Sequence, residues 1–202
     1  MLAAVQPFDL AAARDRTIPD VLPGPGDPPL RVLLCGINPG LTSAATGWHF
    51  ARPGNRFWPA LHGAGFTPRR LRPHEQHLLP SFGVGITNIV PRATARADEL
   101  SPAELVAGGA RLRDLVRDLR PSALGIVGIT AYRVAFAAPL ATVGPQPAWG
   151  TTLVWALPNP SGLNAHWSLP AMVAEFTRFR QAAAAVGSGL SDPSKTPDHP
   201  KS

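Results

Sequence analysis

Four short runs of apolar and branched residues recur along the chain, each bounded by glycine, proline or asparagine. They cover residues 30–35, 84–90, 123–127 and 152–157. Runs of this length between turn-forming residues are typical of strands that are buried on both faces. The stretches between them have helical character, so strands and helices alternate. This order predicts an α/β fold, a three-layer α/β/α sandwich with a central parallel sheet of about four strands.

Helices are predicted over residues 55–64, 67–79, 101–119, 130–137 and 168–185. The third begins most clearly, because Ser101 and Glu104 have the spacing of a capping box and Pro102 occupies the first helical position. Two stretches are predicted to be irregular, the long loop 36–54 and the Pro/Gly-rich segment 140–150. Long loops inside compact domains are commonly functional, which directs attention to residues 36–54.

The length of 202 residues suits one domain of ordinary size. We expect that domain over residues 20–186, with an N-terminal tail over 1–19 and a disordered C-terminal tail over 187–202. No apolar stretch is long enough to cross a membrane, and the N-terminus lacks the pattern of a secretory signal. The sequence therefore favours a cytoplasmic, nucleoid-associated protein.

The net charge is +6, and the basic residues are almost all arginine. Such a balance favours an anionic partner, with nucleic acid ahead of a membrane surface, although solvated surface arginines would give the same count. The single cysteine, Cys35, excludes an internal disulfide and a cysteine-based zinc site. It falls inside the first predicted strand, where it is expected to be a small core residue.

Two predicted strands run into similar loops, Gly-Ile-Asn-Pro-Gly at 36–40 and Leu-Pro-Asn-Pro-Ser-Gly at 157–162. The carboxyl ends of parallel strands meet at one edge of a sheet, which is where open α/β sheets bind ligands. Asn38 and Asn159 would then face a single cleft that has carboxamides but no evident strong base. Amides orient a water and bind a planar polar ligand, so this cleft suits a reaction with a good leaving group.

Four motifs together resemble those of the mismatch-specific uracil/thymine DNA glycosylases, a branch of the uracil-DNA glycosylase superfamily. They are Gly36–Leu41 (Gly-Ile-Asn-Pro-Gly-Leu), Pro53–Trp58 (Pro-Gly-Asn-Arg-Phe-Trp), Gly85–Asn88 (Gly-Ile-Thr-Asn) and Asn159–Leu163 (Asn-Pro-Ser-Gly-Leu). The resemblance implies a monomeric enzyme of base excision repair that flips a pyrimidine out of double-stranded DNA. It would hydrolyse the glycosidic bond of uracil in G·U mismatches, and less efficiently of thymine or modified pyrimidines, leaving an abasic site. No metal or other cofactor is implied.

The same resemblance implies roles for individual residues. Asn38 would position the water that attacks C1′ of the deoxyribose. The base would be bound by Ile37, Ser43, Phe50, Asn88 and Asn159, with the Phe50 ring stacked on it. A wedge of Gly162, Leu163, Asn164, Ala165 and His166 would enter the gap left by the flipped base. The DNA backbone would be contacted by Arg52, Arg56, Arg92 and Ser161.

Two other functions stay open at this point. Because the motifs contain no strong base, the chain could instead be a non-catalytic module that binds lesions or abasic sites. A hydrolase of free nucleosides is the third reading, which the basic charge and the wedge argue against. The turn after the second strand leaves a further question, whether a carboxylate in place of Ala93 would activate the water, since Asp98 is the acidic residue nearby.

Overall fold

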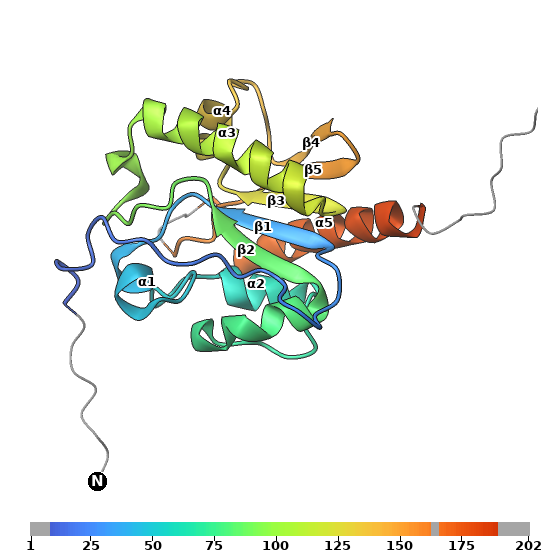
Figure 1. The fold of residues 1–202 in the computed structure, drawn as a ribbon, viewed down its shortest axis with the longest axis horizontal. Coiled ribbons are helices and arrows are strands. Elements are labelled where there is room, and N and C mark those ends of the chain that lie inside the picture. The colour runs from blue at the N-terminus through green and yellow to red at the C-terminus, as the bar shows by residue number, and fades with distance from the viewer. Residues whose placement is uncertain (1–8, 163–165, 190–202) are drawn as a thin grey trace, which may run out of the picture.

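The fold is a central sheet with helices on both faces, seen in a computed structural model that describes residues 9–162 and 166–189 (Figure 1). Its strands are β1 (Val32–Gly36), β2 (Val84–Asn88), β3 (Ala123–Val127), β4 (Gly144–Trp149) and β5 (Thr152–Leu157). Their order across the sheet is β2-β1-β3-β5-β4, and every pairing is parallel except that of β4 with β5. The predicted α/β sandwich is confirmed, with a sheet of five strands where about four were expected.

The additional strand, β4, lies within the segment 140–150 that we predicted to be a loop. Residues Pro145 and Pro147 argued against a strand, because proline cannot donate to a sheet ladder. In the structure β4 is an edge strand that pairs only with β5, so a residue without an N–H is tolerated on its free side. The prolines therefore mark an edge of the sheet rather than a loop.

The core lies in two layers, one on each face of the sheet. Along β1 the side chains alternate: Val32 and Leu34 join one buried cluster, whereas Leu33 and Cys35 join the other. All five residues of β1 are buried, as expected for a strand covered on both faces. Cys35 is fully buried, which confirms the prediction that it is a core residue.

The helical segments are α1 (Leu41–Thr46), α2 (Phe57–Gly63), the 3₁₀ helix η1 (Pro73–Phe82), the 3₁₀ turn η2 (Ala97–Glu99), α3 (Pro102–Leu119), α4 (Ile129–Ala135) and α5 (Leu169–Gly189). Helices α3 and α4 pack together on one face of the sheet, and α2 and α5 on the other (Figure 1). The prediction of an irregular segment over 36–54 missed α1, which has only six residues and no side-chain cap. The predicted C-terminal tail begins within α5, and its residues from 190 onward lie outside the described part of the chain.

Helix α3 sets the position of the carboxyl end of β2. Its N-terminus has the predicted capping box, in which Ser101 Oγ accepts from the Glu104 amide at 3.2 Å. Gly108 lets the helix approach closely, since a Cβ there would stand 2.3 Å from the carbonyl oxygen of Ile89. Arg111 then donates to the carbonyl oxygens of Ile89 and the last residue of β2. The end of this strand is thereby fixed.

The N-terminal segment runs along the β2 edge of the sheet, opposite to β4, and reaches the loop after β2. Val21 and Ile86 exchange two backbone hydrogen bonds of 2.8 Å. Farther along, the Ala93 amide donates to the Arg16 carbonyl oxygen at 2.9 Å, and the Asp15 amide donates to the Ala93 carbonyl oxygen at 3.0 Å. This segment thus fixes loop 91–96, which stands beside the Asn-Pro-Gly loop.

Candidate active site

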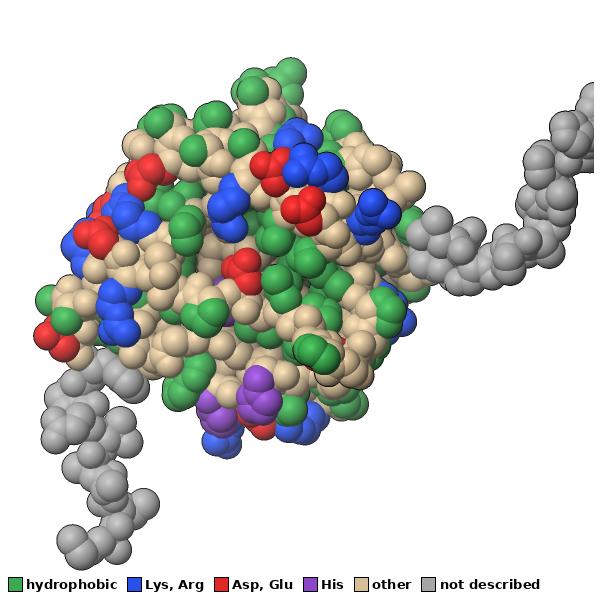
Figure 2. Space-filling model, viewed as in Figure 1, with side chains coloured by type: hydrophobic (Ala, Val, Ile, Leu, Met, Phe, Trp, Pro, Cys, Tyr) green, Lys and Arg blue, Asp and Glu red, His purple; other side chains and the backbone are tan. Residues whose placement is uncertain are grey.

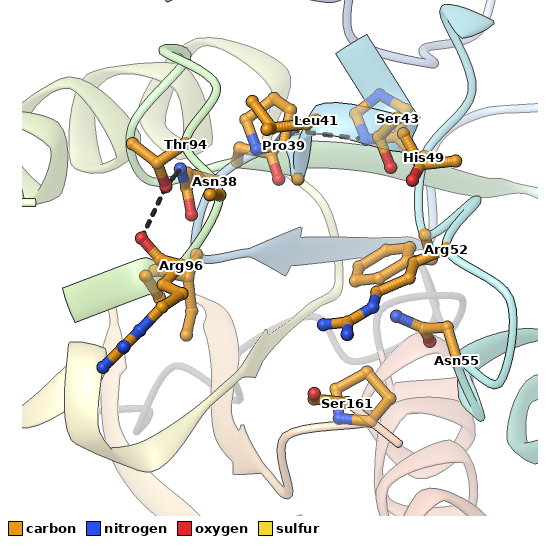
Figure 3. A pocket seen from close by; sticks show the side chains of 18 of the residues that line it. Asn38, Pro39, Leu41, Ser43, His49, Arg52, Asn55, Thr94, Arg96 and Ser161 are labelled. Atoms are coloured by element: carbon orange, nitrogen blue, oxygen red, sulfur yellow. Dashed lines mark hydrogen bonds between the residues drawn. The ribbon is translucent and has the colours of Figure 1, made fainter. Parts of the chain in front are cut away.

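A cavity of about 710 Å³ opens at the carboxyl ends of the parallel strands (Figure 3). Segments 37–55 (which includes α1), 94–98 and 159–161 form most of its lining. The predicted site residues that it brings together are Ile37, Asn38, Ser43, Phe50, Arg52, Asn88, Asn159 and Ser161. Residues from both Asn-Pro loops therefore meet in one cavity.

The carboxamide of Asn38 is held in one orientation. Its Nδ2 donates to the carbonyl oxygen of Arg92 at 2.9 Å and to Oγ1 of Thr94 at 2.7 Å. Thr94 Oγ1 in turn donates to the carbonyl oxygen of Arg96 at 2.7 Å, as the dashed lines in Figure 3 show. An amide nitrogen has two hydrogens, so both are used, and Oδ1 remains as the acceptor on the side of the cavity.

Phe50 occupies a strained backbone position with φ of 53°, in the left-handed region that L residues avoid at a cost of about 1–2 kcal/mol. One face of its ring stacks on Phe57, with centroids 3.8 Å apart and planes 14° apart. The tip of the ring lies over Gly36, where a Cβ would come within 3.2 Å of it. The strand end needs glycine at this point, because any side chain would fill the space beside the ring.

The neighbours of Phe50 hold that backbone in place. The Ala51 amide donates to Oγ of Ser43 at 3.2 Å, and the His49 amide donates to the side-chain oxygen of Gln76 at 2.7 Å. On the other side, Trp58 Nε1 donates to the His49 carbonyl oxygen at 3.2 Å. Trp58 and Phe57 are buried and belong to the core.

Asn88 and His49 form a buried pair inside the cavity. Asn88 Nδ2 lies 3.3 Å from Nδ1 of His49, and Nε2 of His49 lies 3.0 Å from the carbonyl oxygen of Pro19. Burial lowers the pKa of His49 from its ordinary value, and the nearby charge of Asp20 and the Pro19 carbonyl offset this only in part. The imidazole is therefore neutral near pH 7.

The second Asn-Pro loop is attached to the segment before α2 by Arg56. The Arg56 amide donates to the carbonyl oxygen of Pro160 at 2.9 Å, and its guanidinium donates to the carbonyl oxygens of Ser161 (2.7 Å) and Trp167. Gly162 is exposed and passes so close to Gly54 that a Cβ would come within 2.8 Å of its carbonyl oxygen. The guanidinium of Arg56 thus binds backbone carbonyl oxygens of the protein itself on both sides of the predicted wedge.

Of the wedge itself, Leu163, Asn164 and Ala165 lie outside the described residues, and His166 is exposed. Asn159 Oδ1 accepts from the Ser161 amide at 3.0 Å, which shapes the turn that leads to this segment.

The arginines that we predicted to contact the DNA backbone lie in different surroundings. Arg52 lines the cavity and reaches toward it from the loop before α2 (Figure 3). Arg92, in contrast, donates to Glu104 and to Asp15, each at 2.8 Å, and these carboxylates raise its pKa. A contact of Arg92 with phosphate requires exchange of these ion pairs. On the face seen in Figure 2, basic and acidic side chains are interspersed, so that face offers no continuous basic surface.

The position of Ala93 argues against a catalytic carboxylate there. Its side chain is fully buried and packs with Ala13, Ile18 and Ala44 instead of lining the cavity. The acidic residue that does line the cavity is Asp98, whose carboxylate is paired with Arg96.

Two residues of the site were not identified from the sequence, Thr94 and His49. The available signal for Thr94 was its place in the loop after β2, because β2 neighbours β1 and their carboxyl ends meet at one edge. His49 gave no such signal, since its partners Pro19 and Asn88 are far from it in the sequence.

Among residues 9–162 and 166–189, no group of three or more His, Cys, Asp or Glu side chains gathers in a way that could hold a metal ion. In the same ranges, no helix has the length and apolar character needed to span a membrane.

The cavity at the carboxyl ends of the parallel strands includes neutral amides and an aromatic ring, which are groups suited to a planar polar ligand in an α/β protein. Comparison with protein families agrees with this class: residues 23–184 match the uracil DNA glycosylase superfamily. The match covers more than half of the chain, and the protein belongs to this superfamily. Membership implies a DNA glycosylase, a hydrolase of N-glycosidic bonds that acts on DNA in repair.

Proposed function

We propose that the protein is a monofunctional, monomeric glycosylase of the mismatch-specific branch. It flips uracil out of a G·U mismatch and hydrolyses its bond to C1′, which leaves an abasic site. A mismatched base costs less to unstack and unpair than a base in a Watson–Crick pair, so the opening step itself favours the lesion.

The observation that carries this proposal is the orientation of Asn38. Because Nδ2 already donates to Arg92 and Thr94, the side chain offers a water molecule an acceptor, Oδ1. A water that donates to Oδ1 presents a lone pair to C1′ as the bond from C1′ to N1 breaks. The bonding electrons leave with the pyrimidine, and the water oxygen forms the new bond to C1′ and loses its proton to solvent.

The rest of the cavity supports the departure of the base. The Phe50 ring, stacked on Phe57, offers its other face to a flipped pyrimidine. Ile37 and Phe50 line the cavity, and their backbone groups are proposed to bind the pyrimidine edge; donors that face a developing anion stabilise it. Since the carboxamide is a weak base, most of the rate enhancement comes from positioning and from stabilising the leaving group.

We also propose that uracil is preferred to thymine. Ser43 is buried in the wall of the cavity, and its Oγ accepts a hydrogen bond from the Ala51 amide. The C5 methyl group of thymine needs room at the place that the resemblance assigns to Ser43. A fixed wall at that place leaves room for the C5 hydrogen of uracil more readily than for the C5 methyl group of thymine.

The direct test is base release from otherwise identical duplexes with U·G, U·A, T·G and T·A pairs, with enzyme in excess over DNA. We expect release in the order U·G, then U·A and T·G, with T·A intact, detected as alkali-labile abasic sites. Equal rates for U·G and U·A would refute the mismatch preference. Tight binding of abasic DNA with no release from any duplex would support the non-catalytic binding module, which membership in the superfamily does not favour.

A further inference from the structure

We propose that a second cavity, next to the active site, binds phosphodiester groups of the DNA strand that flanks the flipped nucleotide, through Arg70 and Arg72. The inference deepens the proposed function and rests on it in one respect, that duplex DNA is bound across the active site. Neither arginine belongs to one of the four motifs, and neither lines the active-site cavity.

The second cavity has a volume of about 460 Å³ and shares a wall with the active site. Phe50, Arg52 and Asn55 line both cavities, and Figure 3 shows Arg52 and Asn55 on the wall of the active-site cavity. The buried side chains of Trp58 and Leu71 also contribute to the lining. A water molecule in the liquid occupies about 30 Å³, so the cavity has room for a phosphodiester group without movement of protein atoms.

The segment between α2 and η1 directs both arginines to the surface. Leu71 is 2% exposed and belongs to the core cluster that contains Trp58, whereas Arg70 and Arg72 on either side of it are exposed. The backbone of Arg72 is extended, with φ of −91° and ψ of 157°. Alternate residues of an extended chain point the same way, so burial of Leu71 leaves its two neighbours at the cavity.

Hydrogen bonds hold this segment at both ends. The Thr67 hydroxyl donates to the Arg69 carbonyl oxygen at 2.8 Å, and the Arg72 amide donates to a carboxylate oxygen of Glu75 at 2.8 Å. The other carboxylate oxygen of Glu75 pairs with the Arg69 guanidinium at 2.8 Å. The acidic residue of the segment is therefore already engaged by Arg69 and by a backbone amide.

Positive charge in the second cavity is not balanced by carboxylates. Arg52, Arg70 and Arg72 line it, and no acidic residue is among the described residues of its lining. In the described part of the chain none of these three arginines forms an ion pair, in contrast to Arg92 and Arg96. Like charges in one cavity repel one another, and an anion that enters removes this repulsion. The guanidinium fork matches the oxygens of a phosphate, so a phosphodiester is a suitable anion.

The position of the cavity identifies this anion as the backbone of DNA. Gly54, which lines the cavity, lies against Gly162 at the start of the predicted wedge, where a Cβ would come within 2.8 Å of the Gly54 carbonyl oxygen. The wall between the two cavities thus stands beside the segment expected to enter the duplex. Phosphates of one strand follow one another about every 3.4 Å along the helix axis. A strand that leaves the active site over Arg52 therefore brings its next phosphates to Arg70 and Arg72.

The test is the salt dependence of DNA binding by Arg70→Gln, Arg72→Gln and the double variant. The probe is a duplex with a tetrahydrofuran abasic-site analogue opposite guanine, which binds without turnover. Its dissociation constant is measured by fluorescence anisotropy between about 0.05 and 0.3 M salt. Arg120→Gln is the matched control, because Arg120 is exposed and lies between α3 and β3, at the amino ends of the strands and away from the active site.

We expect each lost phosphate contact to lower the slope of log Kd against log salt concentration by about 0.9, which weakens binding about eightfold at about 0.1 M salt. The double variant should show about twice this change in slope, and Arg120→Gln should show none. Arg70→Lys and Arg72→Lys keep the charge and should keep the slope. An unchanged slope in the double variant, or an equal change in Arg120→Gln, would overturn the proposal.

A second measurement separates a local contact from a general effect of charge. The same duplex is shortened so that it ends next to the lesion, on one side in the first version and on the other side in the second. The two substitutions should weaken binding of the full duplex and of one shortened duplex only, because only one flank crosses the cavity. An equal effect on both shortened duplexes would contradict the proposal. If wild type binds the probe but releases no uracil from a G·U duplex, the proposed function fails while the phosphate site stands.

Discussion

Thr94→Val tests how much the orientation of the Asn38 carboxamide matters, because it leaves Asn38 itself in place. Thr94 is 1% exposed, and valine has nearly the same shape, so the change removes a hydroxyl without leaving a cavity. The carboxamide keeps its 2.9 Å hydrogen bond to the Arg92 carbonyl oxygen and loses the 2.7 Å bond to Thr94 Oγ1. It can then rotate, and the water acceptor is no longer held toward the cavity.

The size of the effect follows from these contacts. A hydrogen bond of this kind contributes about 1.4 kcal/mol, which corresponds to about tenfold in rate. Loss of all positioning in Asn38→Ala is expected to cost more, about 10³-fold. Thr94→Val also leaves the Arg96 carbonyl oxygen without its donor, so the free energy of unfolding should fall by about 1–3 kcal/mol. Thr94→Ser keeps the hydroxyl and should retain both rate and stability.

The assay is a double-mutant cycle on single-turnover uracil release, with enzyme in excess over a G·U duplex. Because Thr94 acts through Asn38, Thr94→Val should have no further effect in the Asn38→Ala background, and the coupling energy should equal the whole effect of the single change. If the two effects add, Thr94 acts independently of Asn38, and the reasoning from the hydrogen bonds is refuted.

Four further outcomes follow from the site and from the ion pair of Arg92 with Glu104. Gly36→Ala places a methyl group 2.6 Å from Asn88 Oδ1, so base release should fall by about 100-fold or more, with a stability loss of about 1–3 kcal/mol measured by denaturant unfolding. Ala93→Asp buries a carboxylate in an apolar cluster and should cost about 3–5 kcal/mol of stability without faster release; faster release would restore the hypothesis of a missing carboxylate. Burial lowers the pKa of His49, so the unfolded chain binds its proton more readily, and the melting temperature should fall as pH drops below about 6.5, but less in His49→Gln. The pKa of Glu104 is lowered to about 2 by the hydrogen bond from Arg92, so a further loss is expected between pH 4.5 and 2.

The parts of the fold that depend on local patterns could be predicted. The strand over 152–157 and the capping box at Ser101 are local signals, and both were correct. Strand β4 could not be predicted, because whether Pro145 is tolerated depends on its position at the edge of the sheet. Helix α1 was missed because a six-residue helix between loops has too few apolar positions to show a period.

The candidate site, like the fold, could be predicted from the sequence only in part. Asn38 and Asn159 could be placed in one cavity, since both follow parallel strands and such strand ends share one edge. The side chains that contact Asn38 and Asn88 could not be predicted, because Thr94 contacts Asn38 across 56 residues and His49 contacts Asn88 across 39. The tautomer of His49 depends on a backbone carbonyl of the N-terminal segment, and no side-chain pattern marks such an acceptor.

The proposed function depends most on Asn38 as the residue that positions the attacking water. The measurement that tests it compares wild type and Asn38→Ala for single-turnover uracil release and, with the same G·U duplex, for DNA binding. We predict that release falls by about 10³-fold while the dissociation constant changes by less than about threefold. Release by Asn38→Ala at a rate close to that of wild type would contradict the claim and would require another group in the cavity to position the water.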